Sequence, residues 1–133
     1  MKLKNFVLSK DLIGIEIGGD YFDFHNCFDY EGLEKTDEIV KLKWKRNKGE
    51  WVPADHPHQI RITVAGVRYL DIRGEPSDTI AEFGFFENSS LGMVDYNGAQ
   101  MPSEGNEVFV IRFENGAEIA LMASEAVASA NDV

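Results

Sequence analysis

The sequence has one cysteine, no long apolar run and no recognisable secretory signal. Because Cys27 is the only cysteine in 133 residues, an internal disulfide cannot form, which is typical of proteins from a reducing compartment. No apolar run approaches the roughly 18 residues that span a bilayer. The N-terminus also lacks the apolar segment and cleavage site of a signal peptide. We therefore expect a cytoplasmic protein that does not interact with a membrane.

The sequence also lacks any segment of about 11 residues or more with apolar residues at the helical period. Apolar residues instead recur at every second position in short segments, which are separated by Gly, Pro, Asn and Asp. Strands are predicted at 2–9, 11–17, 21–28, 39–46, 59–73, 80–86, 93–101 and 107–123. This pattern predicts an all-β fold with a single domain over 1–133, either an antiparallel two-layer sandwich or a bent β-roll.

The clearest element is a hairpin at 107–123, in which two apolar runs flank Asn115-Gly116. This dipeptide favours a type I′ turn. The first run, 108–113, is apolar on both faces and is therefore predicted to be a central, covered strand. The second run places Ile119 and Leu121 on one face.

Four other segments carry specific expectations. The polar stretch 31–38 is interpreted as a loop, and 47–57 as a long turn broken by Gly and Pro. A change of parity at Gly66 predicts a bulge or sharp bend. Ser124 has the chemistry of a helix N-cap, so 124–133 is predicted to form either a short helix or a frayed tail.

Basic residues are nearly absent from the C-terminal part. Residues 75–133 hold 11 acidic side chains and one basic, Arg112, whereas 1–74 hold 12 of each, so the net charge of -10 arises after position 74. This imbalance serves either solubility or the recognition of a basic partner. It argues against nucleic-acid binding, which needs clustered Lys and Arg.

Five of the 13 basic residues lie within 41–48. Lys41, Lys43 and Lys45 alternate with apolar residues, so they indicate the solvated face of a strand. A contact between these lysines and the acidic half of a second copy is the alternative, which would make the protein a homo-oligomer.

Two groups of residues suggest catalytic or metal-binding chemistry, and each has a plainer explanation. Asp55-His56-Pro57-His58 invites a metal hypothesis, but the two histidines have neither helical spacing nor a second ligand cluster, so a surface turn stiffened by proline is the favoured interpretation. His25 and Cys27 share a face of the predicted strand, but no third group is indicated that would orient the histidine as a base. We therefore assign no metal, cofactor or catalytic residue from these patterns.

The carboxylates and tryptophans offer two further candidates. Glu82, Glu87 and Asp95 would form a catalytic acid pair if two of them lined one cleft. Trp44 has the inward parity of its strand and is expected in the core. Trp51 lies in a turn and is a candidate contact residue.

Several segments resemble the bacterial immunity protein 50-like family. They are Phe24-His25-Asn26, the strand VKLKW, the stretch QIRITVAGV followed by YLDI, and the closing FENGAEIAL, which together span about 22–122. Asn26 stands where that family usually has Asp. The resemblance implies a β-rich fold and, for some relatives, neutralisation of a partner toxin by binding.

The leading hypothesis is a non-enzymatic, immunity-type protein that neutralises a basic toxin domain through an acidic surface. One alternative is a small hydrolase or lyase with paired carboxylates in a β-roll cleft, and another is a homo-oligomeric structural module. The expected contact residues are Glu75, Asp78, Glu82, Glu87, Asp95 and Trp51.

Overall fold

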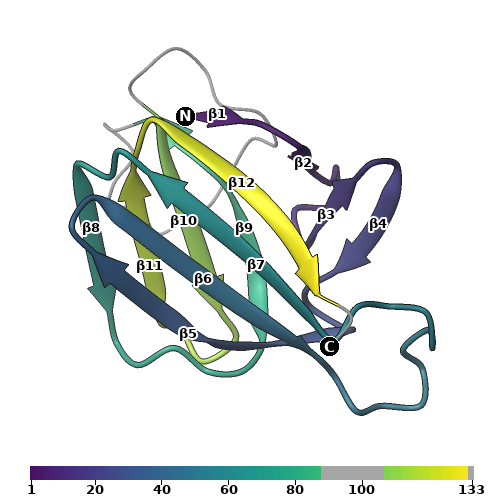
Figure 1. The fold of residues 1–133 in the computed structure, drawn as a ribbon. Helices are drawn as coiled ribbons and strands as arrows, with labels where there is room; N and C mark the ends of the chain where they lie inside the picture. Colours follow the sequence, from purple (N-terminus) through teal and green to yellow (C-terminus); the bar gives the residue numbers. More distant parts are fainter. Residues whose placement is uncertain (88–106, 132–133) are drawn as a thin grey trace.

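Two β-sheets pack face to face, and a third, smaller sheet lies beside them (Figure 1). The structure is a computed structural model that describes residues 1–87 and 107–131, and of Glu87 only the backbone. The five-stranded sheet has the order β1-β12-β7-β6-β5, the four-stranded sheet β8-β11-β10-β9, and the three-stranded sheet β2-β3-β4. The strands are β1 (Lys2–Leu3), β2 (Phe6–Leu8), β3 (Gly14–Ile17), β4 (Asp20–Asp23), β5 (Phe28–Thr36), β6 (Ile39–Arg46), β7 (Gln59–Ala65), β8 (Tyr69–Arg73), β9 (Ile80–Glu87), β10 (Glu107–Phe113), β11 (Glu118–Met122) and β12 (Glu125–Asn131).

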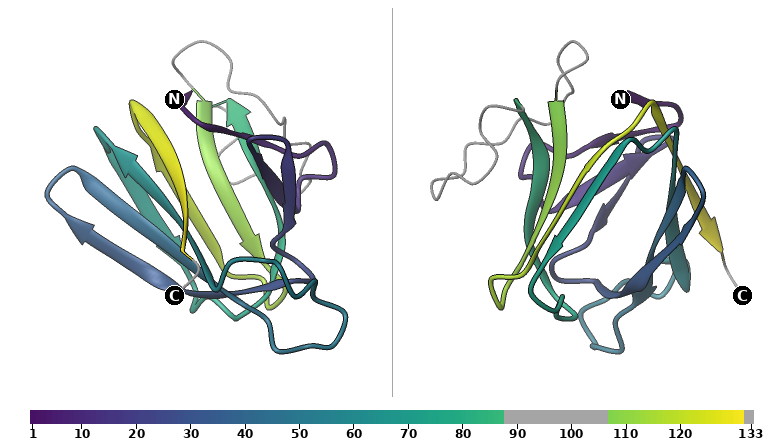
Figure 2. Two further views of the ribbon diagram at one scale, coloured as in Figure 1. Left: turned by 45° about the vertical axis from the view of Figure 1, so that its right-hand side comes forward. Right: turned by 90° about the vertical axis from the view of Figure 1, so that its left-hand side faces the viewer.

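Paired strands are antiparallel, except for the short parallel pair of β1 with β12. The described residues contain no helix. Figure 2 shows the two larger sheets as separate layers, with β2, β3 and β4 at one side of them. The prediction of an all-β, two-layer sandwich is confirmed.

A series of aromatic rings connects the two layers. It runs from Phe113 of β10 through Tyr30, Trp44, Phe24 and Phe83 to Phe109, which is again on β10, with centroid separations of 4.9, 5.5, 4.6, 5.7 and 5.8 Å. Trp44 is fully buried, as its parity predicts. Tilted and edge-on aromatic pairs add to the stabilisation that apolar burial supplies, so this series fixes both the spacing and the register of the layers.

The alternation predicted for β6 and β7 is present throughout both strands. Val40 and Leu42 of β6, with Ile60 and Ile62 of β7, are buried, and the intervening polar residues face outward. β10 is an interior strand, as predicted, and is buried along nearly its whole length. The turn expected within 93–101 lies outside the described residues.

The prediction for 21–38 is wrong in two respects. β4 ends at Asp23, because its carboxylate accepts the backbone N–H groups of His25 and Asn26 and turns the chain. Most of the stretch predicted to be a loop, residues 31–36, belongs to β5, an edge strand paired with β6, and only residues 37–38 form a turn. A bulge between Tyr30 and Gly32 shifts the inward-facing position to Leu33. Apolar and polar residues therefore do not alternate regularly in the sequence of this strand.

The C-terminal segment is a strand, not a short helix or a frayed tail. β12 pairs with β7 from Glu125 to Asn131, and β1 pairs with its other side. Ala126 and Ala128 are buried, whereas Val127 and Ser129 are exposed. The period of two is therefore present, but it is carried by small side chains with a low preference for strands.

The β10–β11 hairpin is confirmed, but its turn differs from the one predicted. Phe113 N–H donates to Ala117 O (2.9 Å), and Gly116 N–H donates to Phe113 O (2.9 Å). Gly116 has a φ of 89°, whereas Asn115 is not among the residues with positive φ. This geometry is a three-residue connection with a glycine bulge rather than a type I′ turn.

The predicted bend at Gly66 carries the chain from one sheet to the other. β7 belongs to the five-stranded sheet and β8 to the four-stranded sheet. Gly66 has a φ of 68°, and a Cβ built at this position would lie 2.8 Å from Cβ of Ser124. Both the backbone conformation and the space therefore require glycine.

We expect Gly66→Ala to lower the free energy of unfolding by about 3 kcal/mol, because left-handed strain and overpacking add. Gly18→Ala is the matched control, since Gly18 has a φ of 58° with no heavy atom near the added Cβ, and it should cost about 1–2 kcal/mol. Urea unfolding measures both values. Equal losses of unfolding free energy in the two variants would show that the close approach of the added methyl group to Ser124 does not destabilise the fold.

Candidate functional site

One end of the four-stranded sheet gathers several acidic side chains from separate segments. The loop after β8 meets the β10–β11 turn there, because Asn115 Nδ2 donates to Glu75 O (2.7 Å) and Glu114 N–H donates to Thr79 O (3.0 Å). The acidic residues at this end, called the acidic end below, are Glu75, Asp78, Glu82, Glu114 and Glu118. Three of them were expected contact residues, and the structure adds two that the sequence reasoning did not select.

Arg112 compensates part of this negative charge. Its Nε lies 2.9 Å from Glu118 Oε2, and its Nη1 lies 3.9 Å from Glu82 Oε1. Glu75 and Asp78 are exposed, and no described basic side chain forms an ion pair with either of them. The acidic end therefore keeps an excess of solvated carboxylates.

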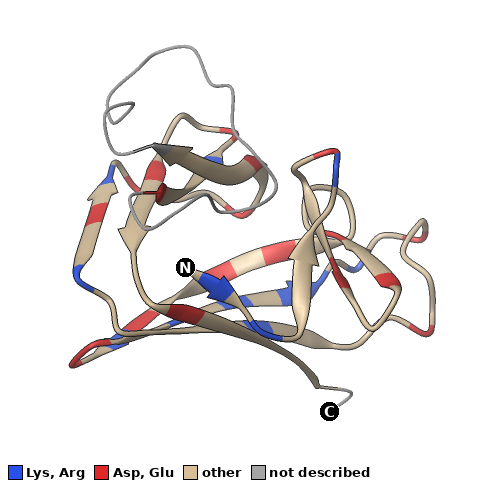
Figure 3. Cartoon of the chain, turned by 90° about the horizontal axis from the view of Figure 1, so that it is seen from above, with Lys and Arg blue, Asp and Glu red and all other residues tan. Residues whose placement is uncertain are grey.

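The other two predicted acids do not extend this cluster. Glu87 is five positions beyond Glu82 on β9, which places its backbone about 17 Å away along the strand. Its backbone pairs with that of Glu107 at the opposite end of the sheet. Asp95 lies outside the described residues. Figure 3 also shows Asp and Glu on both large sheets and in their loops, so the negative charge does not form one continuous face.

His25 connects the acidic end to the turn after β4. Its Nδ1 lies 2.5 Å from Ile80 O and 3.5 Å from Glu114 Oε1. His25 and Cys27 do not share a strand face as predicted, because the chain turns between β4 and β5. Burial raises the pKa of the Cys27 thiol, and the charge of Asp23 raises it further, so the thiol stays protonated and is a poor nucleophile.

Trp51 is held in a fixed, solvent-facing position on the loop between β6 and β7. Its side chain is 65% exposed, while its Nε1 donates to Asn26 O (2.7 Å). The indole ring lies so close to Gly49 that any side chain at this position would collide with it. An exposed, oriented tryptophan is typical of contact residues, because little side-chain entropy remains to be lost on binding.

The histidines of the same loop face different environments. His56 stacks on Phe28 at 5.7 Å and meets Phe22 edge-on at 5.3 Å, whereas His58 is exposed. His56 therefore lies in the turn that the sequence indicates, where its N–H donates to Pro53 O (3.1 Å), but its ring is partly buried against the core. Within 1–87 and 107–131, no group of three or more His, Cys, Asp or Glu side chains is arranged to hold a metal ion.

A pocket of about 320 Å³ is lined by Asp20, Tyr21, Asp55 and His56, among others. Two carboxylates thus line one cavity, but the side chain of Asp55 is 93% exposed. A carboxyl that acts as a general acid near neutral pH needs an apolar or charged environment that raises its pKa. Asp55 has no apolar enclosure of that kind, so the pocket gives no positive support for acid catalysis.

Tyr21 at this pocket is part of a polar network that joins β4 to the turn after β2. Its hydroxyl donates to Asp11 Oδ2 (2.6 Å), and Ser9 Oγ donates to Asp11 Oδ1. Partial burial acts to raise the pKa of Asp11, but the hydrogen bonds from Ser9, Tyr21 and the Ile13 N–H outweigh burial and lower it. Burial and the hydrogen bond to Asp11 raise the pKa of Tyr21.

No family model, curated protein or solved structure matches this chain. The resemblance to immunity proteins therefore stays a prediction.

Among the described residues, none lies in a helix long and apolar enough to cross a bilayer.

Tyr21→Phe should raise the pKa of Asp11, because it removes one donor that stabilises the carboxylate. An NMR titration of the Asp11 side-chain carbon measures the change, and Tyr69→Phe on β8 is the control. Since the folded-state pKa of Asp11 is depressed, this carboxylate stabilises the fold above its ordinary pKa, and the contribution is lost as the pH falls through the folded value. An unchanged Asp11 titration in Tyr21→Phe would contradict the proposed hydrogen bonding.

Trp51 and Trp44 should respond differently to a collisional quencher. Acrylamide is expected to quench Trp51, which is 65% exposed, and to leave Trp44, which is 0% exposed, nearly unaffected. Trp51→Phe should therefore remove most of the quenchable emission and leave a blue-shifted spectrum. Strong quenching in Trp51→Phe would show that Trp44 is accessible and that the core is not closed as described.

Proposed function

We propose that this protein is a non-enzymatic binding protein that recognises a basic protein surface through its acidic end. The observation that supports the proposal is that two hydrogen bonds, Asn115 Nδ2 to Glu75 O and Glu114 N–H to Thr79 O, join the loop that carries Glu75 and Asp78 to the turn that carries Glu114. Among the described residues, no Lys or Arg is paired with any of these three carboxylates. Loops that are held together by backbone hydrogen bonds offer a charge pattern that needs little reorganisation on binding.

The mode of action we propose is that of an immunity protein. The net charge of -10 attracts a basic partner over a distance, and the acidic end supplies the short-range contacts. The bound protein then occludes the working surface of its partner. The resemblance to immunity proteins supports a toxin domain as that partner.

The hydrolase or lyase alternative receives less support. Of the three carboxylates from which an acid pair was predicted, Glu82 and Glu87 are separated by about 17 Å along β9, so these two do not act on one bond. Asp95 lies outside the described residues. Among the other described residues, the pocket at Asp20 and Asp55 is open to solvent, and the Cys27 thiol has a raised pKa.

The acidic end should bind a basic peptide, and binding should weaken as salt rises. Hexalysine titrated into ¹⁵N-labelled protein is expected to shift the amide signals of Glu75, Asp78 and Glu114. Raising the ionic strength should reduce affinity, because exposed charges are screened over about 8 Å at 0.15 M salt. A salt-insensitive affinity would contradict an electrostatic mode of binding.

The triple variant Glu75→Gln/Asp78→Asn/Glu114→Gln should lose about tenfold in affinity for hexalysine, since each exposed ion pair contributes about 0.5 kcal/mol. The matched control is Glu16→Gln/Asp37→Asn/Glu38→Gln, which removes the same charge from exposed positions elsewhere. Equal losses in both variants would show that net charge alone governs binding. The same two triple variants then test any partner captured from the source cell. The association rate of that partner should fall more with the variant of the acidic end than with the control variant.

A further inference from the structure

The loop between β6 and β7 encloses a pocket with a positive lining, in a protein whose net charge is -10. The pocket has a volume of about 560 Å³, within the range of small-molecule sites. Its lining includes Lys45, Arg46, Lys48, His58, Gly49 and Glu50. Three basic residues, a histidine and a single acidic residue, Glu50, thus border the same pocket.

The walls of this pocket are fixed by hydrogen bonds. Arg46 Nη1 donates to the carbonyl oxygens of Ala54 (3.2 Å) and His56 (3.0 Å) across the loop. Asn47 Nδ2 donates to Asp29 Oδ1 (2.9 Å), and Gly49 N–H donates to Asn47 Oδ1 (2.7 Å). The pocket is therefore formed before any ligand arrives, which lowers the entropic cost of binding.

The cations of this pocket have no acidic partner among the described residues. Lys4, Lys43, Arg73 and Arg112 each form an ion pair with a carboxylate. No ion pair joins Lys45, Arg46 or Lys48 to Glu50 or to any other described carboxylate. Arg46 is held by Nη1 alone, so its remaining N–H groups keep their capacity to donate to a ligand.

We propose that this pocket binds a small molecule that carries a phosphate group. A phosphate dianion presents several oxygens to donors that approach from different directions, and it gains from a guanidinium and two ammonium groups together. A monocarboxylate has fewer acceptor sites and half the charge of a phosphate dianion, so it should form fewer and weaker contacts with the basic residues of this pocket. The site lies on the loop between β6 and β7 and does not depend on the acidic end or on its proposed partner.

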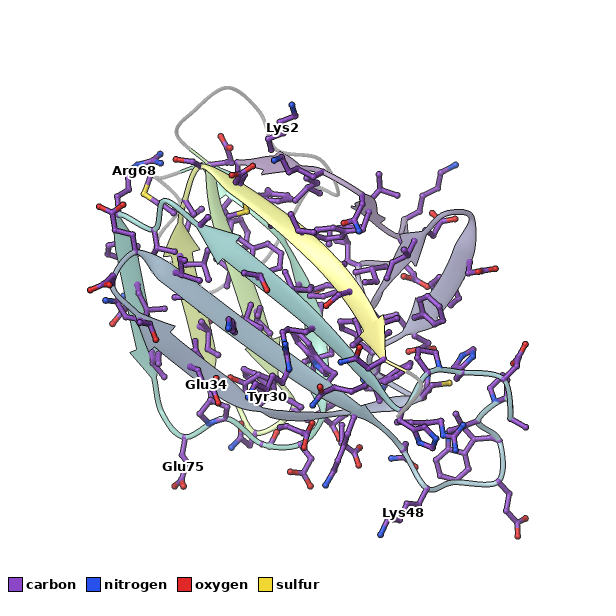
Figure 4. All side chains as sticks on the ribbon, viewed as in Figure 1. Lys2, Tyr30, Glu34, Lys48, Arg68 and Glu75 are labelled. Carbon is purple, nitrogen blue, oxygen red and sulfur yellow. The ribbon has the colours of Figure 1, made fainter. Side chains whose placement is uncertain are left out.

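Figure 4 shows that Lys48 and Glu75 lie far apart along the lower edge of the molecule, Lys48 on the right and Glu75 on the left. The two surfaces are therefore separate, and each can be altered without touching the other. Trp51 supplies a built-in reporter, because its ring lies against Gly49, a residue of the pocket lining.

The test is a titration with inorganic phosphate, phenyl phosphate and benzoate at constant ionic strength, with chloride as the balancing anion. Both phosphates should give a saturable change in Trp51 emission and in the amide signals of Lys48 and Gly49, and benzoate should bind at least tenfold more weakly than phenyl phosphate. Equal responses to benzoate, or changes that stay linear and match those of chloride, would overturn the proposal.

Lys45→Gln/Lys48→Gln should weaken phosphate binding at least tenfold, because two charge-assisted contacts are lost. The matched control is Lys10→Gln/Lys41→Gln, which removes two exposed lysines outside the pocket, one of them on the same strand. Unchanged affinity in the first variant, or an equal loss in the control, would show that the pocket does not hold the anion.

Discussion

The burial of aromatic rings between the two large sheets is the constraint on which the rest of the structure depends. The series begins and ends on β10 and includes rings from β5, β6, β9 and the turn after β4. Large side chains dominate core energetics because each removes a large apolar area from water. Once these rings are inside, the parity of every neighbouring strand is determined, and polar residues are forced to the outer faces.

Both surface features that we assign to binding are anchored to this interior. Tyr30, a member of the aromatic series, also donates its backbone N–H to Asp78 O (2.7 Å) and so holds the loop of the acidic end. On the other side, the His56 ring packs on Phe28 and Phe22 and fixes the far end of the loop that carries Trp51. Loops that are tied to a rigid core in this way can present charged groups in one arrangement.

The sequence predicts those elements in which large apolar residues alternate without interruption. β6, β7 and β11 satisfy this condition, and β10 is recognised instead by an apolar run on both faces; their inward or covered faces are close to those observed. β5 does not, because its bulge moves the inward position from Tyr30 to Leu33. β12 alternates with a period of two, but its buried residues are alanines, which have a low intrinsic preference for strands. Their burial depends on pairing with β7.

The grouping of surface residues was harder to predict, because it depends on register rather than on order in the chain. Glu114 joins Glu75 and Asp78 only because two loops meet, and Glu87 is excluded because β9 carries it to the opposite end of the sheet. The basic cluster at 41–48 is evident in the sequence, but its alternation with apolar residues favours the solvated face of a strand. The turn that follows it, with glycine at 49 and prolines at 53 and 57, was the available sign that the last of these cations border a pocket.

The distribution of charge in space differs from its distribution along the chain, and the difference matters physically. Residues 1–74 are neutral in sum, yet they supply the unpaired cations of the pocket, whereas the acidic end draws its carboxylates from 75–118. The net charge of -10 produces an attraction for a basic partner that decays over about 8 Å at physiological salt. At contact distance the nearest groups dominate, so a ligand in the pocket meets mainly the cations that border it. A single chain can therefore attract a basic protein from a distance and still hold an anion in a pocket, because the two interactions act over different lengths.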